Sequence, residues 1–151
     1  MFGLFKNRRR RRFRAGPFPD TWARILEKNV PYYRHLPEED QHELRQHVKV
    51  FLGEKHFEGC RGVHITDEIR VTVAGQACVL LLHRETDYFP SLVTILVYPS
   101  AFVAKTVVQS HETFAVHGEE EREGEAWQRG VVVLAWYSVH EGFRHPHAVD
   151  N

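Results

Sequence analysis

The chain has 151 residues, enough for one domain with a substantial core but not for two domains of ordinary size. Its hydrophobic content of 42% and charged content of 26% are ordinary for a globular protein, which excludes a disordered or fibrous chain. No apolar run approaches the roughly 18–20 residues of a membrane-spanning helix. The two cysteines, Cys60 and Cys78, form neither a disulfide framework nor a metal knuckle, so we expect buried, reduced thiols in a cytoplasmic protein.

The formal net charge of zero conceals a strongly basic amino end. Residues 1–30 contain nine Lys or Arg against two acids, so the rest of the chain is acidic. We expect residues 1–16 to form a disordered basic arm, because neighbouring arginines repel one another. The arm is no secretory signal, since its apolar residues precede the basic ones. It is a candidate contact for anionic lipid or nucleic acid, or else a solubilising tail of no specific role. The candidate contact residues are Arg8, Arg9, Arg10, Arg11, Arg12 and Arg14.

Three segments in the first part of the chain predict helices. Residues 18–29 place Trp22, Ile25 and Leu26 at helical spacing, and residues 36–55 open with a proline and three acids. The second helix carries an apolar stripe, which consists of Leu44, Val48, Phe51 and Leu52. Residues 66–85 contain a strand-like IRVTV run, but Thr66, Asp67 and Glu68 are a helix-start signal, and we expect a mostly buried helix there.

The second part of the chain favours strands. Residues 91–103 hold the clearest one, with Val93, Ile95 and Val97 on one face, and a further strand is expected within 105–118. Residues 130–136, GVVVLAW, resemble a short strand buried on both faces. Because helices come first and strands later, we expect an α+β fold with a small mixed or antiparallel sheet and a buried helix against it.

Histidine-rich stretches suggest a zinc site at first sight, but their spacing does not support one. A zinc peptidase helix of the His-Glu-x-x-His type needs two histidines four residues apart, so that both imidazoles reach one ion. His140 and His145 are five apart, and His111 and His117 are six apart. We interpret them as ordinary histidines, with weak metal binding by His140, His145 and His147 as the alternative. No complete catalytic set is present, and we predict neither catalytic nor metal-binding residues in this chain.

Several phrases resemble one known family, the Mlc titration factor A family of zinc-dependent peptidases. They are HLPEEDQHELRQHVKVFLGEKHFEGCRGVHITDEIRVTVAGQACVLLL, ILVYPSAFV and GEAWQRGVVVLAW. The last phrase matches the family's Gly-Glu-Ala-Trp and Gly-Pro-Val-Val-Leu-Ser-Trp, with Val131 in place of the usual proline. The resemblance covers residues 17–151 and implies that they form the amino-terminal, non-catalytic part of a zinc-peptidase-like domain.

The resemblance also implies where the family's zinc helix would stand. HPHAVDN, ending at Asn151, matches the loop that precedes His-Glu-x-x-His in the family, so the zinc ligands would lie beyond this residue. We therefore expect a truncated chain that acts as a scaffold, without catalytic zinc and inactive alone. The complete family protein would be a cytoplasmic hydrolase that uses zinc to cleave peptide substrates, with a transcriptional repressor as a partner. The alternative is a non-catalytic binding module that uses its acidic body for a protein partner and its basic arm for membrane or nucleic acid.

Overall fold

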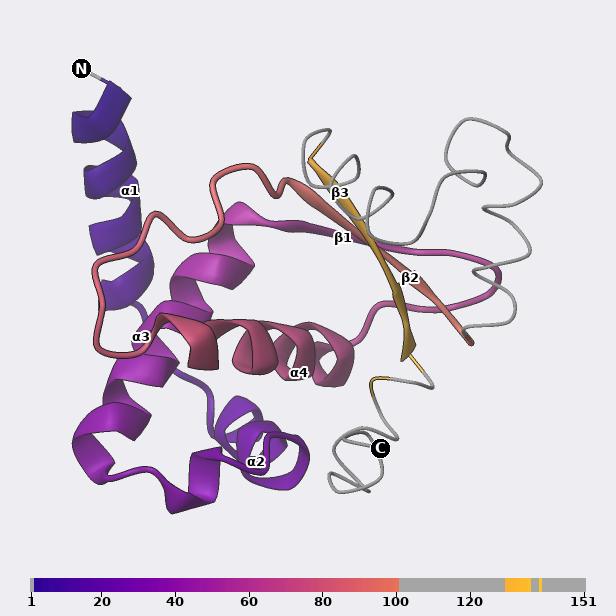
Figure 1. Ribbon diagram of the computed structural model, residues 1–151, viewed down its shortest axis with the longest axis horizontal. Helices are drawn as coiled ribbons and strands as arrows, with labels where there is room; N and C mark the ends of the chain where they lie inside the picture. The colour runs from indigo at the N-terminus through magenta and orange to yellow at the C-terminus, as the bar shows by residue number, and fades with distance from the viewer. Residues whose placement is uncertain (1, 101–129, 137–138, 140–151) are drawn as a thin grey trace. The chain divides into compact units, whose positions relative to one another are not determined.

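The computed structural model describes residues 2–100, 130–136 and 139 (Figure 1). The chain divides into two compact units. The first unit comprises Met1–Glu54 and Arg70–Tyr88, and the second comprises Lys55–Ile69 and Phe89–Asn151. Among the described residues, no helix is both long and apolar enough to cross a membrane.

The described helices and strands follow one another as helices, strand, helix and two further strands. The helices are α1 (Phe2–Ala15), α2 (Asp20–Asn29), α3 (Glu38–Glu54) and α4 (Asp67–Cys78), with short 3-10 turns η1 (Tyr33–His35) and η2 (Val79–Leu81). The strands are β1 (His56–Gly59), β2 (Thr94–Tyr98) and β3 (Val131–Ala135).

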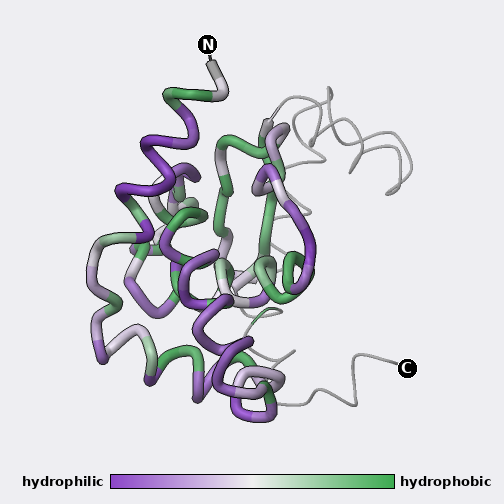
Figure 2. The backbone as a smooth tube through the Cα atoms, turned by 90° about the vertical axis from the view of Figure 1, so that its left-hand side faces the viewer, coloured by the Kyte–Doolittle hydropathy of each residue, from purple (hydrophilic) through white to green (hydrophobic). Residues whose placement is uncertain are grey.

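The first unit begins with a helix where the sequence suggested disorder. Residues 2–15 form α1, which packs against α3 (Figure 1). The helix is hydrophilic along most of its length, with a hydrophobic stretch near its amino end (Figure 2). The two helices come close at Gly53 of α3, where an added Cβ would lie 2.6 Å from the ring of Phe13. The expectation of a disordered arm overlooked contacts to residues far along the chain.

The predicted helices of residues 18–29, 36–55 and 66–85 are confirmed as α2, α3 and α4, although α4 ends at Cys78 and only the short η2 follows it. The apolar stripe predicted for α3 is buried, and Leu44 and Val48 are fully so. In α4 the helix start is also confirmed, because the Ile69 N–H donates to the Thr66 hydroxyl at 3.2 Å. Residues 71–75 are buried without a break, which no strand-like alternation would give.

The second unit contains a three-stranded sheet in the order β1-β2-β3, and both strand pairs are parallel. The prediction of a mixed or antiparallel sheet is therefore wrong, although helices and a small sheet together keep the α+β class. Parallel neighbours need a long crossover connection, and residues 60–93, which include α4, supply the one between β1 and β2. The HFEG sequence of β1 has no apolar alternation that would identify it as a strand.

The central strand β2 has the burial expected of a sheet interior. Of the three residues predicted to share one face, Ile95 and Val97 are buried in the strand, whereas Val93 lies outside it and is 58% exposed. In β3 the residues are half-buried and Val133 is exposed, in contrast to the predicted burial on both faces. Cys78 is buried, and Cys60 is half-buried. The predicted strand within 105–118 lies outside the described residues.

Candidate functional site

The most highly charged contacts of the described residues lie where α1 meets α3 and the segment 83–88, all within the first unit. Arg10, 6% exposed, is at the centre. Its guanidinium binds both oxygens of Glu54, at 2.6 and 3.1 Å, in a bidentate arrangement. It also donates to the carboxylate of Asp87 at 2.8 Å and to the Asp87 carbonyl at 3.0 Å, and lies 4.8 Å from the centre of the Tyr88 ring. Arg10 therefore fixes α1 to two separate parts of the chain.

The charges at this contact reinforce one another. Burial lowers the pKa of Arg10, but its hydrogen bonds to Glu54 and Asp87 outweigh that effect and raise it. Hydrogen bonds from Lys6 and Arg10 hold the pKa of Asp87 below its ordinary value. Lys6 lies 2.9 Å from Asp87, one helical turn before Arg10. Asp87 is thus held in its ionised form by the basic face of α1.

The carboxyl end of α1 is fixed by α3 as well. The ammonium of Lys49 donates to the carbonyl oxygens of Arg14 and Gly16, at 2.6 and 2.7 Å. These carbonyls are among the groups that a helix end leaves without an internal partner, and a cation is favourable there. Burial, followed by the charge of Arg45, lowers the pKa of Lys49.

A chain of hydrogen bonds continues from α1 along α3. The guanidinium of Arg14 donates to the Tyr88 hydroxyl at 3.0 Å, and that hydroxyl lies 2.7 Å from Nδ1 of His47. Nε2 of His47 lies 2.9 Å from Glu43. One proton arrangement satisfies every group: Tyr88 donates to Nδ1, and Nε2–H donates to the carboxylate. Tyr88 has a positive φ of 57°, which an aromatic residue rarely adopts, and these bonds hold it there.

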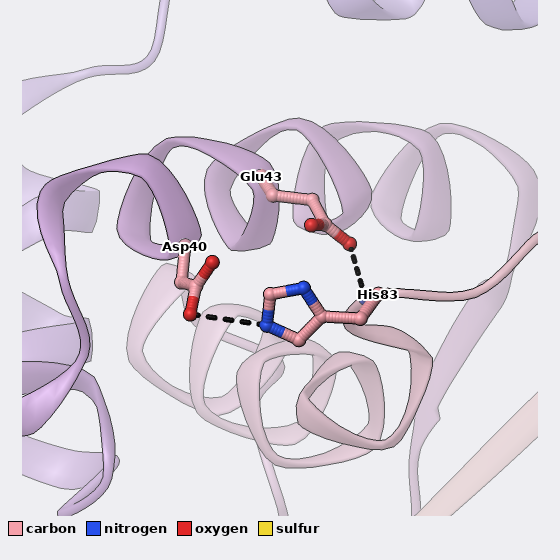
Figure 3. Close-up of side chains that lie close together, drawn as sticks. All are labelled: Asp40, Glu43 and His83. Carbon is pink, nitrogen blue, oxygen red and sulfur yellow. Dashed lines mark hydrogen bonds and ion pairs between the residues drawn. The ribbon is translucent and has the colours of Figure 1, made fainter.

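The same chain ends at a group of two carboxylates and a histidine (Figure 3). The carboxylate of Glu43 accepts the backbone N–H of His83 at 3.0 Å, and Nε2 of His83 lies 3.1 Å from Asp40. Burial raises the pKa of Glu43, but the bonds from His83 and His47 outweigh that effect and lower it. The ligand-type atoms of Asp40, Glu43 and His83 lie within 4.8 Å of one another. These contacts clamp the turn after η2 onto the amino-terminal half of α3.

The six arginines proposed from the sequence as a contact arm divide into two groups. Arg10 and Arg14 point into the protein and make the contacts described above. Four others are exposed, namely Arg8, Arg9, Arg11 and Arg12. The inward residues follow a helical spacing of three to four that begins at Lys6, and this spacing was the signal available in the sequence. The histidines considered for zinc, at positions 111, 117, 140, 145 and 147, lie outside the described residues.

Residues 4–151 match the family model described as glucose-regulated metallo-peptidase M90. An uncharacterized protein of Synechocystis sp. is 38% identical to the chain over 125 residues, which is 82% of this chain and 45% of the relative. The Mlc titration factor A of Klebsiella pneumoniae subsp. pneumoniae is 25% identical over 122 residues, 81% of this chain and 45% of the relative. That of Yersinia enterocolitica is 24% identical over the same shares. The chain thus spans about half the length of the curated relatives it matches.

Proposed function

Because the chain belongs to the glucose-regulated metallopeptidase family M90, we propose that it forms the amino-terminal, non-catalytic scaffold of a zinc-dependent peptidase. The observation that carries this proposal is a family match across residues 4–151 of a sequence without His-Glu-x-x-His. In a peptidase of this kind, a bound zinc ion activates water to attack a peptide carbonyl. The cleaved substrate would be a peptide, and the enzyme's compartment would be the cytoplasm.

The family name implies a metal, and the described residues do not fit a peptidase zinc site. Their one group with three suitable donor atoms is Asp40, Glu43 and His83. It offers a single imidazole, whereas peptidase zinc is typically held by at least two histidines. The carboxylates of Asp40 and Glu43 also hold the turn at His83 through hydrogen bonds. We therefore assign no catalytic role to these three residues.

Helices α2 and α4 contribute a closely packed support instead. Helix α4 is buried at successive positions, and its Gly75 lets it approach α2 closely, since an added Cβ would lie 2.6 Å from Leu26. Thr72 and Asn29 join the same two helices through a fully buried hydrogen bond of 2.9 Å. A framework of this kind positions neighbouring segments, and a catalytic site needs such positioning to within about 0.5 Å.

A direct experiment measures the metal content and the peptidase activity of the purified 151-residue chain. We expect well below one zinc per chain and no cleavage of aminopeptidase reporter substrates. One zinc per chain together with activity, both lost on changing His140 and His145 to Ala, would contradict the scaffold assignment.

A chimera tests the supporting role itself. The Synechocystis relative is 38% identical to this chain over the matched 45% of its own length. Residues 1–151 are joined to the part of that relative that follows the matched region. We expect the chimera to bind zinc and cleave reporter substrates, and the carboxyl-terminal segment alone to do neither. Equal zinc binding and activity of the isolated segment would show that the scaffold is not required.

A further inference from the structure

Helix α1 has two faces of different character. Lys6, Arg10, Phe13 and Arg14 form the inward face, which occupies about 100° of the helix circumference at ~100° per residue. The opposite arc, of about 160°, carries side chains that are exposed. We call this arc the outer face of α1, and its large side chains are Leu4, Phe5, Arg8, Arg9, Arg11 and Arg12.

The four outer arginines have no hydrogen bond or ion pair within the part of the chain that the structure describes. Arg8 and Arg12 stand four residues apart, where like charges destabilise a helix. The first turn of α1 has no acid to offset them. Four guanidinium groups gathered on one exposed surface create a strongly positive patch, and such a patch attracts anions.

Two large apolar side chains share this outer face. Leu4 and Phe5 are each 62% exposed. Leu4 stands one turn before Arg8, and Phe5 stands one turn before Arg9. The first turn of the helix is therefore apolar on its outer side, and the next two turns are basic. A helix with aromatic and aliphatic anchors beside arginines is typical of binding in the interface of a membrane.

We propose that the outer face of α1 is a docking surface for anionic phospholipid membranes. The arginines would bind the lipid phosphates, while Leu4 and Phe5 would enter the boundary between headgroups and acyl chains. Neither contribution suffices alone, because stable attachment of a peripheral protein generally needs two signals. This surface is independent of the peptidase function, since no residue of it belongs to the scaffold contacts described above.

The structure favours lipid over nucleic acid as the partner. Binding to a phosphate backbone would use the arginines and leave Leu4 and Phe5 in water. Membrane binding removes both apolar side chains from water, which is favourable in proportion to the area buried. The contacts of Arg10 fix which face of α1 points outward. The outer face is thereby presented before any membrane is met, so little ordering of the helix is needed on binding.

The test is co-sedimentation of the full chain with vesicles in ~0.1 M salt. One set contains phosphatidylglycerol and phosphatidylcholine at a ratio of about one to two, and the other contains phosphatidylcholine alone. We expect binding to the anionic vesicles only. Changing Arg8 and Arg12 together to Gln should weaken it roughly 20- to 30-fold, from about fivefold per arginine. Changing Leu4 and Phe5 together to Ser should weaken it on the order of tenfold.

The matched control changes Arg24 and Arg34 to Gln. Both arginines are exposed and belong to the same unit as α1. Their replacement removes as much charge as the Arg8/Arg12 variant does, so binding should change little if the outer face of α1 is the site. Circular dichroism checks that every variant is folded. Equal losses in the control and in the Arg8/Arg12 variant would overturn the proposal, because net charge would then explain the attachment. Binding that is unaffected by the Leu4/Phe5 variant and abolished by duplex DNA would overturn it too, in favour of a nucleic-acid site.

Discussion

Replacing Arg10 by Met should destabilise the first unit more than any change on the outer face of α1. The side chain of Arg10 is 7% exposed and that of its bidentate partner Glu54 is 12% exposed. Met fills a similar volume but leaves Glu54 as a nearly buried carboxylate without its cation. Removing one partner of such a pair typically costs about 3–5 kcal/mol. Asp87 moderates the loss, because it is 46% exposed and keeps Lys6.

We therefore expect the free energy of unfolding to fall by about 3–4 kcal/mol. For a chain of this size, that corresponds to a decrease in Tm of roughly 6–16 °C. Urea and thermal unfolding followed by circular dichroism measure both quantities. Limited trypsin digestion adds a local readout, because release of α1 would expose its arginines to cleavage.

Two further variants test the role of the Arg10–Glu54 pair. Arg9→Met changes an exposed arginine of the same helix and should alter stability by no more than about 0.5 kcal/mol. Changing Arg10 and Glu54 together to Met should restore most of the loss, because no buried charge is then left unpaired. Equal stability of Arg10→Met and Arg9→Met would contradict the role given to Arg10. A double variant less stable than Arg10→Met alone would contradict it as well.

Three other changes have expected outcomes that unfolding measurements can check. Gly75→Ala should cost about 1–3 kcal/mol, because the new Cβ would lie 2.6 Å from Leu26 in a packed core. Thr72→Val should cost about 1–3 kcal/mol, because it leaves the buried amide of Asn29 without its acceptor. Stability should decrease as the pH falls below about 4.5, because folding lowers the pKa of Glu43 and its contribution is lost when it is protonated. In Glu43→Gln this acid dependence should be smaller.

Each of these changes has a matched control. Gly3→Ala adds a methyl group with no atom within 4 Å and should be neutral or slightly stabilising. Asn29→Leu combined with Thr72→Val removes both hydrogen-bonding partners and should be less harmful than Thr72→Val alone. Glu39→Gln changes an exposed acid of the same helix as Glu43. An acid dependence reduced equally by Glu39→Gln would contradict the role given to Glu43.

Helices that depend on local signals were predictable from the sequence. The apolar stripe of α3 and the capping residue of α4 each lie within a few residues of what they stabilise. Helix α1 differs, because the acids that neutralise its inner face, Glu54 and Asp87, are 44 and 77 positions away from Arg10. A run of arginines considered without those acids indicates repulsion and disorder. The helical spacing of Lys6, Arg10 and Arg14 places the three side chains on one face. That spacing alone does not identify the acids that this face contacts.

The parallel pairing of the strands was not predictable from the sequence for a related reason. Strand β1 has four residues, and His56 and Glu58 give it no hydrophobic alternation. Without β1, helix α4 looked like the end of a helical region instead of the crossover between two parallel strands. The contacts of Asp40 and Glu43 with His83 were equally hidden, since only the folded chain brings the turn after η2 to α3.

The distance in sequence between Arg10 and Asp87 also affects how the chain is made. Helix α1 is synthesised before the aspartate that completes its contacts, which follows Arg10 by 77 residues. At about 5–20 residues per second, translation takes roughly 4–15 s to cover that distance. A helix of 14 residues is marginal in water on its own, and its like charges weaken it further. The bidentate contact of Arg10 with Glu54 can therefore form once 44 further residues have been made, whereas the contact with Asp87 needs 77.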